Sequence, residues 1–203
     1  MSSLAEAAGA RAPKRQRGRL RVAQLLQAAA AVFAEKGYEA ATMTEIALRA
    51  GAPIGSLYQF FPDKGVLADT LVQNYVTLLS DELKALESRA QRTPITTLVE
   101  SLFALLRGHS SERTAAIPLV EVRMDAQTRR TRFRLMMRQR IAAILRAHSA
   151  KLTAEAARDM AIVILQLMKA ASMLGDEEGL TGRSAGLRDL QGLAVQYLQR
   201  RLP

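Results

Sequence analysis

The sequence contains no cysteine and no tryptophan, and only two histidines among its 203 residues. The absence of cysteine excludes disulfide bonds and thiolate metal sites, and it is compatible with a reducing compartment. Aromatic residues make up 4% of the chain, which argues against single-strand recognition by base stacking. His109 and His148 stand far apart without acids at ligand spacing, so we expect neither a metal site nor a bound cofactor.

Catalytic and membrane-spanning patterns are also missing. The chain has no glycine-rich phosphate loop and no cluster of nucleophile, acid and base, so we do not expect an enzyme. Its most apolar run, residues 160–174, is shorter than a membrane span and contains Gln166 and Lys169, which predicts a buried helix. The arginines near the N-terminus are not followed by an apolar run and a cleavage site, so we expect no signal peptide and a cytoplasmic protein.

Positive charge is what the chain has in excess. Its formal net charge is +10 and its isoelectric point is near 10.6. This balance favours a polyanionic partner, either nucleic acid or an anionic membrane surface. The basic N-terminal segment has no apolar face to insert into lipid, which argues against the membrane.

Apolar residues recur at helical spacing through most of the chain, and no alternating strand pattern of useful length is present. Residues 1–18 lack such a stripe and predict a flexible basic arm. Pro118 starts or kinks a helix. The pattern predicts an all-α fold, with helices at about 19–36, 42–50, 53–61, 64–89, 94–108, 126–148, 153–174 and a last one ending at 201.

Residues 42–64 carry the most specific local pattern. Thr42 and Glu45 form a capping box that fixes the start of a short helix. Gly51 permits the left-handed turn that ends this helix, and Pro53 has the fixed φ suited to the first turn of the next. Two short helices joined by a glycine-containing turn form a helix-turn-helix, which places its second helix in the DNA major groove.

The second of these helices supplies the predicted DNA contacts. Leu57 and Phe61 lie four residues apart and should face inward. The remaining surface is expected to carry Ile54, Ser56, Tyr58, Gln59 and Phe60. We expect phosphate contacts from hydroxyl and ammonium groups, and base-edge contacts from Ser56, Gln59 and the methyl groups of Ile54. For Phe60 a core position is an equal alternative. The predicted DNA-binding residues are Thr42, Thr44, Pro53, Ile54, Gly55, Ser56, Tyr58, Gln59, Phe60 and Lys64.

This segment resembles the N-terminal signature of the TetR family of bacterial repressors. The signature is T-x-x-x-I-A-x-x-A-G-V-S-x-G-x-L-Y-x-H-F-x-x-K-x-x-L, and this chain departs from it at Ala52, Pro53 and Phe60. The residues in register are Thr42, Ile46, Ala47, Ala50, Gly51, Gly55, Leu57, Tyr58, Phe61, Lys64 and Leu67.

The resemblance implies a DNA-binding domain at residues 19–65 and an all-helical effector-binding and dimerisation domain at residues 66–203. It also implies that Thr42, Tyr58 and Lys64 touch phosphates and that the protein acts as a homodimer on a double-stranded DNA operator. The expected function is that of a transcriptional repressor released by a small-molecule effector. A nucleoid-type structural DNA binder, whose C-terminal domain contacts a protein, is the alternative.

The helix at 153–174 is apolar over more than half of its circumference, so it needs a second partner surface or full enclosure within one chain. The resemblance implies that it pairs with its twofold mate, together with the last helix. The dimer interface candidates are Ile164, Leu167, Met168, Leu187, Leu190, Val195 and Leu198.

Arg140 lies on an apolar helix stripe, where a charge needs a partner. A structural pair with Glu121 or Asp125 is favoured over an anionic group of a ligand. Methionines near it serve as core filler and would also suit an adaptable pocket. The effector-pocket candidates are Glu121, Met124, Met137, Arg140 and Gln166.

Overall fold

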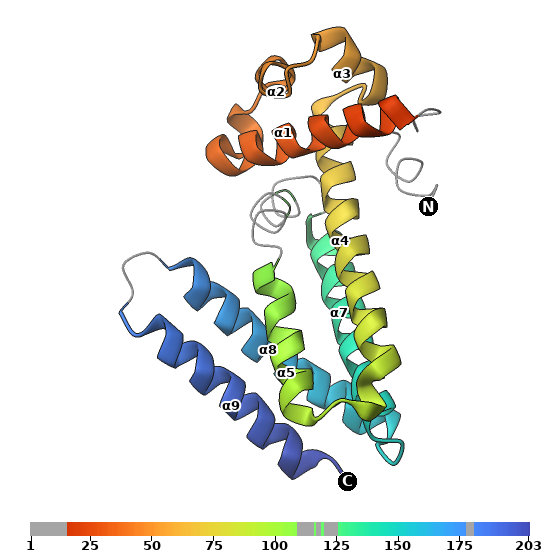
Figure 1. Ribbon diagram of the computed structural model, residues 1–203, viewed down its shortest axis with the longest axis vertical. Coiled ribbons are helices and arrows are strands. Elements are labelled where there is room, and N and C mark those ends of the chain that lie inside the picture. Colours follow the sequence, from red (N-terminus) through yellow and green to blue (C-terminus); the bar gives the residue numbers. More distant parts are fainter. Residues whose placement is uncertain (1–15, 109–115, 117–118, 120–125, 178–180) are drawn as a thin grey trace. The chain divides into compact units, whose positions relative to one another are not determined.

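The computed structural model describes residues 16–108, 116, 119, 126–177 and 181–203. Every regular element in these residues is a helix, so the predicted all-α class is confirmed (Figure 1). Residues 1–15 of the predicted arm, and with them His109, Glu121, Met124 and Asp125, lie outside the described residues. No helix in the described part of the chain combines the length and the apolar character that a membrane crossing requires.

The chain divides into two compact units. Unit 1 comprises Met1–Thr77 and Ser110–Arg130, and unit 2 comprises Leu78–His109 and Thr131–Pro203. Unit 1 holds α1 (Gln16–Ala40), α2 (Met43–Arg49) and α3 (Ile54–Phe60), together with the first half of α4 (Lys64–Arg89). The predicted bounds of α4 are confirmed.

Helix α1 is longer than predicted at both ends. It begins at Gln16, because glutamine and arginine are good helix formers and the chain continues the helix through Gly18. The predicted arm, residues 1–18, is therefore too long, because residues 16–18 belong to α1. The helix predicted to end at residue 36 has a break there and continues: Gly37 has φ 75° and ψ 169°, and a last helical turn follows it to Ala40.

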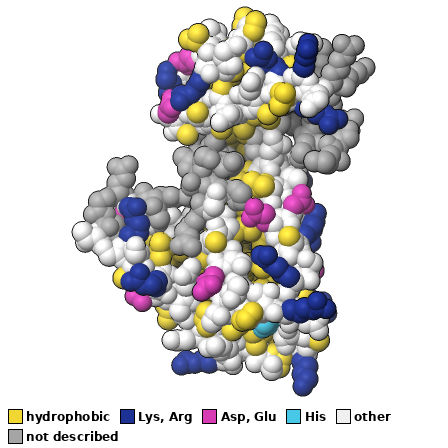
Figure 2. All heavy atoms as spheres, viewed as in Figure 1, with side chains coloured by type: hydrophobic (Ala, Val, Ile, Leu, Met, Phe, Trp, Pro, Cys, Tyr) yellow, Lys and Arg dark blue, Asp and Glu magenta, His cyan; other side chains and the backbone are white. Residues whose placement is uncertain are grey.

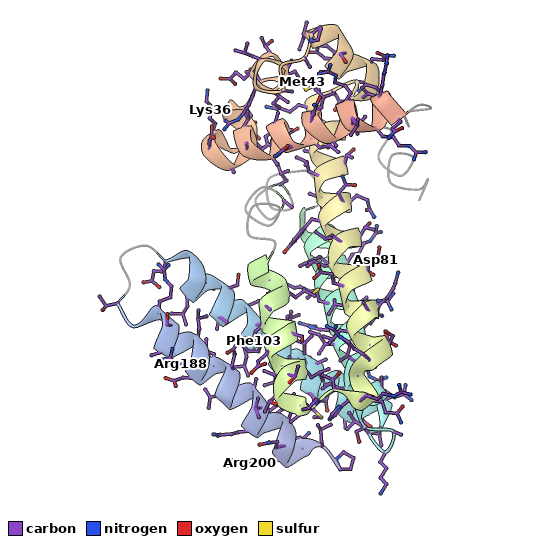
Figure 3. The ribbon with its side chains drawn as sticks, viewed as in Figure 1. Lys36, Met43, Asp81, Phe103, Arg188 and Arg200 are labelled. Atoms are coloured by element: carbon purple, nitrogen blue, oxygen red, sulfur yellow. The ribbon has the colours of Figure 1, made fainter. Side chains whose placement is uncertain are left out.

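The core of unit 1 is formed by one face from each of its helices. Leu25, Ala29 and Phe33 of α1 pack with Ile46 and Ala47 of α2, as the spacing predicted. Helix α3 and the start of α4 close this core with Leu57, Phe61 and Leu67. Met43, labelled in Figure 3, is buried in the same cluster.

Unit 2 is a bundle of helices. Its helices are the second half of α4, the short η2 (Ala90–Arg92), α5 (Ile95–Gly108), most of α7 (Ala126–His148), α8 (Ala154–Asp176) and α9 (Arg183–Arg201). Helices α5, α8 and α9 pack against one another (Figure 1). The Nδ1 of His148 donates to the carbonyl of Ala90 at 2.9 Å, which ties the end of α7 to η2.

Candidate nucleic-acid interface

The start of α2 is fixed by the predicted capping box. The backbone N–H of Glu45 donates to Oγ1 of Thr42 at 3.2 Å, and the backbone N–H of Thr42 donates to Oε2 of Glu45 at 3.1 Å. The Thr42 hydroxyl also donates to the same carboxylate oxygen at 2.9 Å. Thr42 is exposed, but its hydroxyl hydrogen is already engaged within the protein.

Two ion pairs hold α2 against the end of α1. Lys36 contacts Glu45, and Arg49 contacts Glu35 at 2.5 Å. Lys36 lies at the C-terminal end of α1 (Figure 3), and acidic and basic side chains adjoin one another on the surface of this unit (Figure 2).

These contacts change the acid strength of both carboxyl groups. The hydrogen bond from Arg49 lowers the pKa of Glu35 below its ordinary value. The hydrogen bond from Lys36, followed by those from Thr42, lowers the pKa of Glu45. Both glutamates therefore stay ionised at a pH at which a free carboxyl group begins to bind protons. The two ion pairs between α1 and α2 are retained at that pH.

The turn between α2 and α3 depends on Gly51, which has φ 57°. This is the left-handed region predicted for it, where other residues are strained. The N–H of Ala52 donates to the carbonyl of Ala47 at 2.9 Å and closes the turn. Pro53, with φ −58° and ψ 139°, caps α3, so the helix begins one residue later than predicted, at Ile54.

Helix α3 is short and has two distinct faces. Leu57 and Phe61 are 0% and 1% exposed, which confirms that they face inward. Tyr58 is 50% exposed and Ile54 is 40% exposed. The remaining predicted contact residues divide by environment: Thr44, Pro53, Gly55 and Gln59 are exposed, and Ser56 and Phe60 are half-buried.

Phe60 packs partly against the core of unit 1, in agreement with the core alternative. Leu57 and Phe61 pack in the core and hold α3 in place, and the side chains of Tyr58 and Gln59 are exposed on its other side. These groups donate and accept hydrogen bonds, and the methyl groups of Ile54 add an apolar contact. The outer face of α3 therefore has the chemistry needed to contact phosphates and base edges.

Lys64 has a different environment from the one predicted. Its ammonium group donates to the carbonyl oxygens of Tyr38, Glu39 and Ala41, at 2.8, 3.1 and 2.9 Å. It also lies 4.6 Å from the centroid of the Tyr38 ring. A lysine has three N–H donors, and all three are used by these contacts. Lys64 thus binds the end of α1.

Two exposed cations of the same unit, Arg17 and Arg19, are not among the predicted contacts. The predicted arm includes Arg17, whereas both side chains lie exposed in the first turns of α1. No ion pair with another described residue holds either of them. The good helix-forming residues at positions 16 and 17 were the signal for this placement.

The predicted effector residues are not gathered in one described pocket. Met137 is fully buried in α7. Arg140 lies 3.7 Å from Glu87 of α4, a partner that the sequence analysis missed, and both side chains are about one-third exposed. Gln166 is exposed on the surface of α8. It follows Ile162 by four residues and shares the outer face of α8.

The predicted dimer residues are also only partly accessible. Ile164, Met168 and Leu198 are at most 1% exposed within the single chain, so these predictions are wrong: such side chains have no surface to offer a partner. Leu167, Leu187, Leu190 and Val195 are half-buried. The large apolar residues that are exposed on the two helices are instead Ile162, Val163, Met173 and Leu193.

A groove of about 350 Å³ lies between α5 and α9. Val99 and Glu100 line it from α5, and Arg188, Gln191 and Val195 line it from α9. None of the effector-pocket candidates that the structure describes lines this groove, whereas Val195, predicted for the dimer interface, lines it. Arg188 is labelled on α9 in Figure 3.

Comparison with known proteins places the helix-turn-helix in a family context. Residues 25–71 match the model of bacterial regulatory proteins of the tetR family. This range covers the core-forming part of α1, both short helices and the first turns of α4.

Curated relatives and solved structures agree with this match. The transcriptional activator FasR of Mycolicibacterium smegmatis is 39% identical over 124 residues, which cover 55% of this chain and 56% of FasR. The transcriptional repressor KstR2 of Mycobacterium tuberculosis is 43% identical over 56 residues, 28% of each chain. The chain thus spans about half the length of the first of these relatives and less of the second.

Among solved structures, a SmeT–triclosan complex superposes with a TM-score of 0.61 at 19% identity, covering 86% of this chain and 91% of the other. At this identity the match concerns the fold, which extends over nearly the whole chain.

Proposed function

Because this chain belongs to the TetR family of bacterial regulatory proteins, we propose that it is a sequence-specific DNA-binding transcriptional regulator, a repressor released from its operator by a small-molecule effector. The observation that carries the proposal is the orientation of α3. Leu57 and Phe61 are buried, and the side chains of Ile54, Tyr58 and Gln59 are left on the outer surface. In a helix-turn-helix this is the face that enters the major groove.

The exposed residues divide between two kinds of contact. Tyr58 donates its hydroxyl to a phosphate oxygen, and Gly55 lets the backbone come close to the DNA strand. Gln59 and Ser56 contact base edges, and Ile54 packs on a thymine methyl group. Thr42 and Thr44 lie at the start of α2 and Pro53 lies at the start of α3, and all three are exposed. Lys64 is not among the proposed contacts, because its donors are used within the protein.

The protein is proposed to bind its operator as a homodimer in the cytoplasm. Residues 19–65 form the DNA-binding domain, and residues 66–203 form the effector-binding and dimerisation domain. The exposed apolar side chains Ile162 and Val163 of α8 and Leu193 of α9 support a self-complementary interface, since exposed apolar side chains favour association. Such a dimer presents two copies of α3 about 34–36 Å apart, one turn of DNA.

The dimer has a direct test. Sedimentation equilibrium should give twice the chain mass for the wild-type protein and a lower mass for Val163→Glu. Leu135→Glu, on the exposed surface of α7, serves as the control and should leave the dimer intact. A monomeric wild-type protein would reject this part of the proposal.

The effector is proposed to be a small, largely apolar molecule that binds in the C-terminal domain. SmeT has the same fold and was solved with triclosan. Arg140, whose side chain is about one-third exposed, would offer a positive charge there. An effector that prefers a different arrangement of α4, which is shared by the two units, weakens DNA binding by its difference in affinity for the two states.

The test of function begins with selection of a preferred duplex from a random pool, followed by affinity titration at several salt concentrations. Each neutralised phosphate should contribute about 0.9 to the fall of log affinity with log salt. A slope near zero, or equal affinity for all duplexes, would reject sequence-specific binding. In vitro transcription from a promoter carrying the selected site then separates repression from activation.

A thermal-shift screen with small apolar ligands tests the effector, because a ligand that binds only the folded state raises its stability. A ligand found in this way should release the duplex. If none of the ligands stabilises the protein and the duplex affinity shows no sequence preference, the nucleoid-type alternative replaces the proposed function.

A further inference from the structure

The end of α1 forms a socket for an ammonium group. The carbonyl oxygens of Tyr38, Glu39 and Ala41 converge on one point, where Nζ of Lys64 donates to them over 2.8–3.1 Å. The Tyr38 ring forms one wall, with its centroid 4.6 Å from the nitrogen. Three acceptors and an aromatic face match the three donors and the charge of a lysine.

The backbone break at Gly37 explains why these carbonyls are available. Its positive φ of 75° interrupts the regular helix, so the next carbonyls are not all used along the α1 axis. Carbonyls at a helix C-terminus carry partial negative charge and attract a cation. The Tyr38 ring is held in place by Phe33 of the core, with ring centroids 5.7 Å apart.

Lys64 is also the first residue of α4, the helix that follows α3 in the chain. Only residues 61–63 separate it from α3, and two of these are themselves fixed. Phe61 is buried, and Oδ1 of Asp63 accepts the backbone N–H of Val66 at 2.8 Å. The contact between Lys64 and the end of α1 therefore fixes the corner at which α3 ends.

We propose that Lys64 is a positioning residue: its ammonium group locks the first turn of α4 onto the C-terminal carbonyls of α1 and thereby holds α3 at the angle needed for the major groove. This inference rests on the proposed function, since it assigns α3 to DNA. It gives Lys64 an indirect part in DNA binding, in contrast to a direct contact with phosphate.

Substitution of Lys64 by arginine distinguishes a direct phosphate contact from the contact with the three carbonyl oxygens. A guanidinium group is planar and binds a phosphate at least as well as an ammonium group does. It cannot direct three donors to the three carbonyls of the socket in the way that an ammonium group does. Lys64→Arg therefore preserves a phosphate contact but disrupts the socket, whereas Lys64→Met removes both.

The experiment compares Lys64→Arg, Lys64→Met and the control Lys84→Met, which removes one exposed lysine from the same helix. Affinity for the selected duplex is titrated against salt. We expect both Lys64 variants to lose affinity about tenfold, as for a lost charged hydrogen bond, with the wild-type salt slope retained. Lys84→Met should bind as the wild type does.

A direct phosphate contact predicts another pattern: wild-type affinity for Lys64→Arg, and a slope smaller by about 0.9 per site for Lys64→Met. That result overturns the inference, and so does unchanged affinity in both variants. A purely stabilising role would lower the Tm without changing the affinity of the folded protein, which also contradicts positioning. Failure of the wild-type protein to bind any duplex would instead reject the proposed function.

A second readout does not require DNA. In Lys64→Met, the backbone amides of Tyr58, Gln59 and Phe60 should exchange with solvent at least about tenfold faster than in the wild type, because α3 is no longer held at its end. Unchanged protection overturns the inference. If Lys64→Met does not fold, Tyr38→Leu removes the aromatic wall but leaves the lysine, and it should shift both readouts in the same direction.

Discussion

Leu57 and Tyr58 are successive residues of α3 with opposite environments: the first is 0% exposed and the second is 50% exposed. This helix of seven residues therefore has one side buried in the core and one side exposed to solvent. The same pair therefore separates the contribution of α3 to stability from its contribution to DNA binding.

Substitution of Leu57 by alanine should lower the free energy of unfolding by about 2–5 kcal/mol, because it leaves a cavity in the core of unit 1. Tyr58→Ala should change stability by less than about 1 kcal/mol, since half of this side chain already contacts solvent. Urea denaturation followed by circular dichroism measures both. Equal losses in the two variants would contradict the assigned faces.

The capping box predicts a loss of about 1 kcal/mol for Thr42→Ala, because the variant removes the acceptor for the Glu45 backbone N–H. Thr44→Ala is the matched control: this threonine is exposed on the same helix and should contribute less than about 0.5 kcal/mol. Denaturant midpoints compare them. A cap that matters only for DNA binding would leave the midpoint of Thr42→Ala unchanged.

Unit 1 should lose stability in acid because Glu35 and Glu45, which form ion pairs in the folded state, become protonated. The folded-state pKa of Glu35 and of Glu45 lies below the ordinary value of 4.5, so the unfolded chain binds protons first as the pH falls. Their contribution is therefore present above about pH 4.5 and is lost as the pH falls through the lower folded pKa values.

The variant carrying Glu35→Gln and Glu45→Gln should show a flatter dependence of unfolding free energy on pH between about 5 and 3 than the wild type does. Glu39→Gln, which changes one exposed glutamate of the same unit, should keep the wild-type dependence. Parallel curves for the wild type and the double variant would show that these ion pairs do not persist in solution.

The helix-turn-helix could be predicted because its signals are local. Thr42 and Glu45 are three residues apart, Gly51 must supply a positive φ, and the spacing of Leu57 and Phe61 selects the buried side. Each of these follows from backbone geometry within one or two helical turns. They placed the outer face of α3 correctly.

The socket of Lys64 could not be predicted in this way. Its acceptors lie 23–26 residues earlier in the chain and are backbone carbonyls, which every residue type carries. Nothing in the side-chain sequence marks them as a cation site. The same reason applies to Glu87, which reaches Arg140 from a different helix.

The prediction of Ile164 and Met168 as dimer residues was wrong for another reason. Helix α8 is apolar on two sides, so its pattern alone does not show which side covers the core. Ile164 and Met168 cover it, and Ile162 and Val163 are left outside. A shift of one or two positions around a helix exchanges the two sides.

The ion pair between Arg140 and Glu87 should contribute little to stability. Both side chains are about one-third exposed and 3.7 Å apart, so Arg140→Gln should cost less than about 1 kcal/mol. A double-mutant cycle with Glu87→Gln measures the coupling. If Arg140→Gln leaves stability intact but abolishes release of the duplex by an effector, the arginine binds the ligand.

The most direct test of the central claim, that the outer face of α3 contacts duplex bases, is selection of preferred duplexes by the wild type, Gln59→Ala and Tyr58→Phe. We predict that Gln59→Ala relaxes the preference at one base pair of each half-site, at a cost of about 1–3 kcal/mol for the original site. Tyr58→Phe should select the wild-type sequence and bind all duplexes more weakly. Identical preferences and affinities for all three proteins would contradict the account.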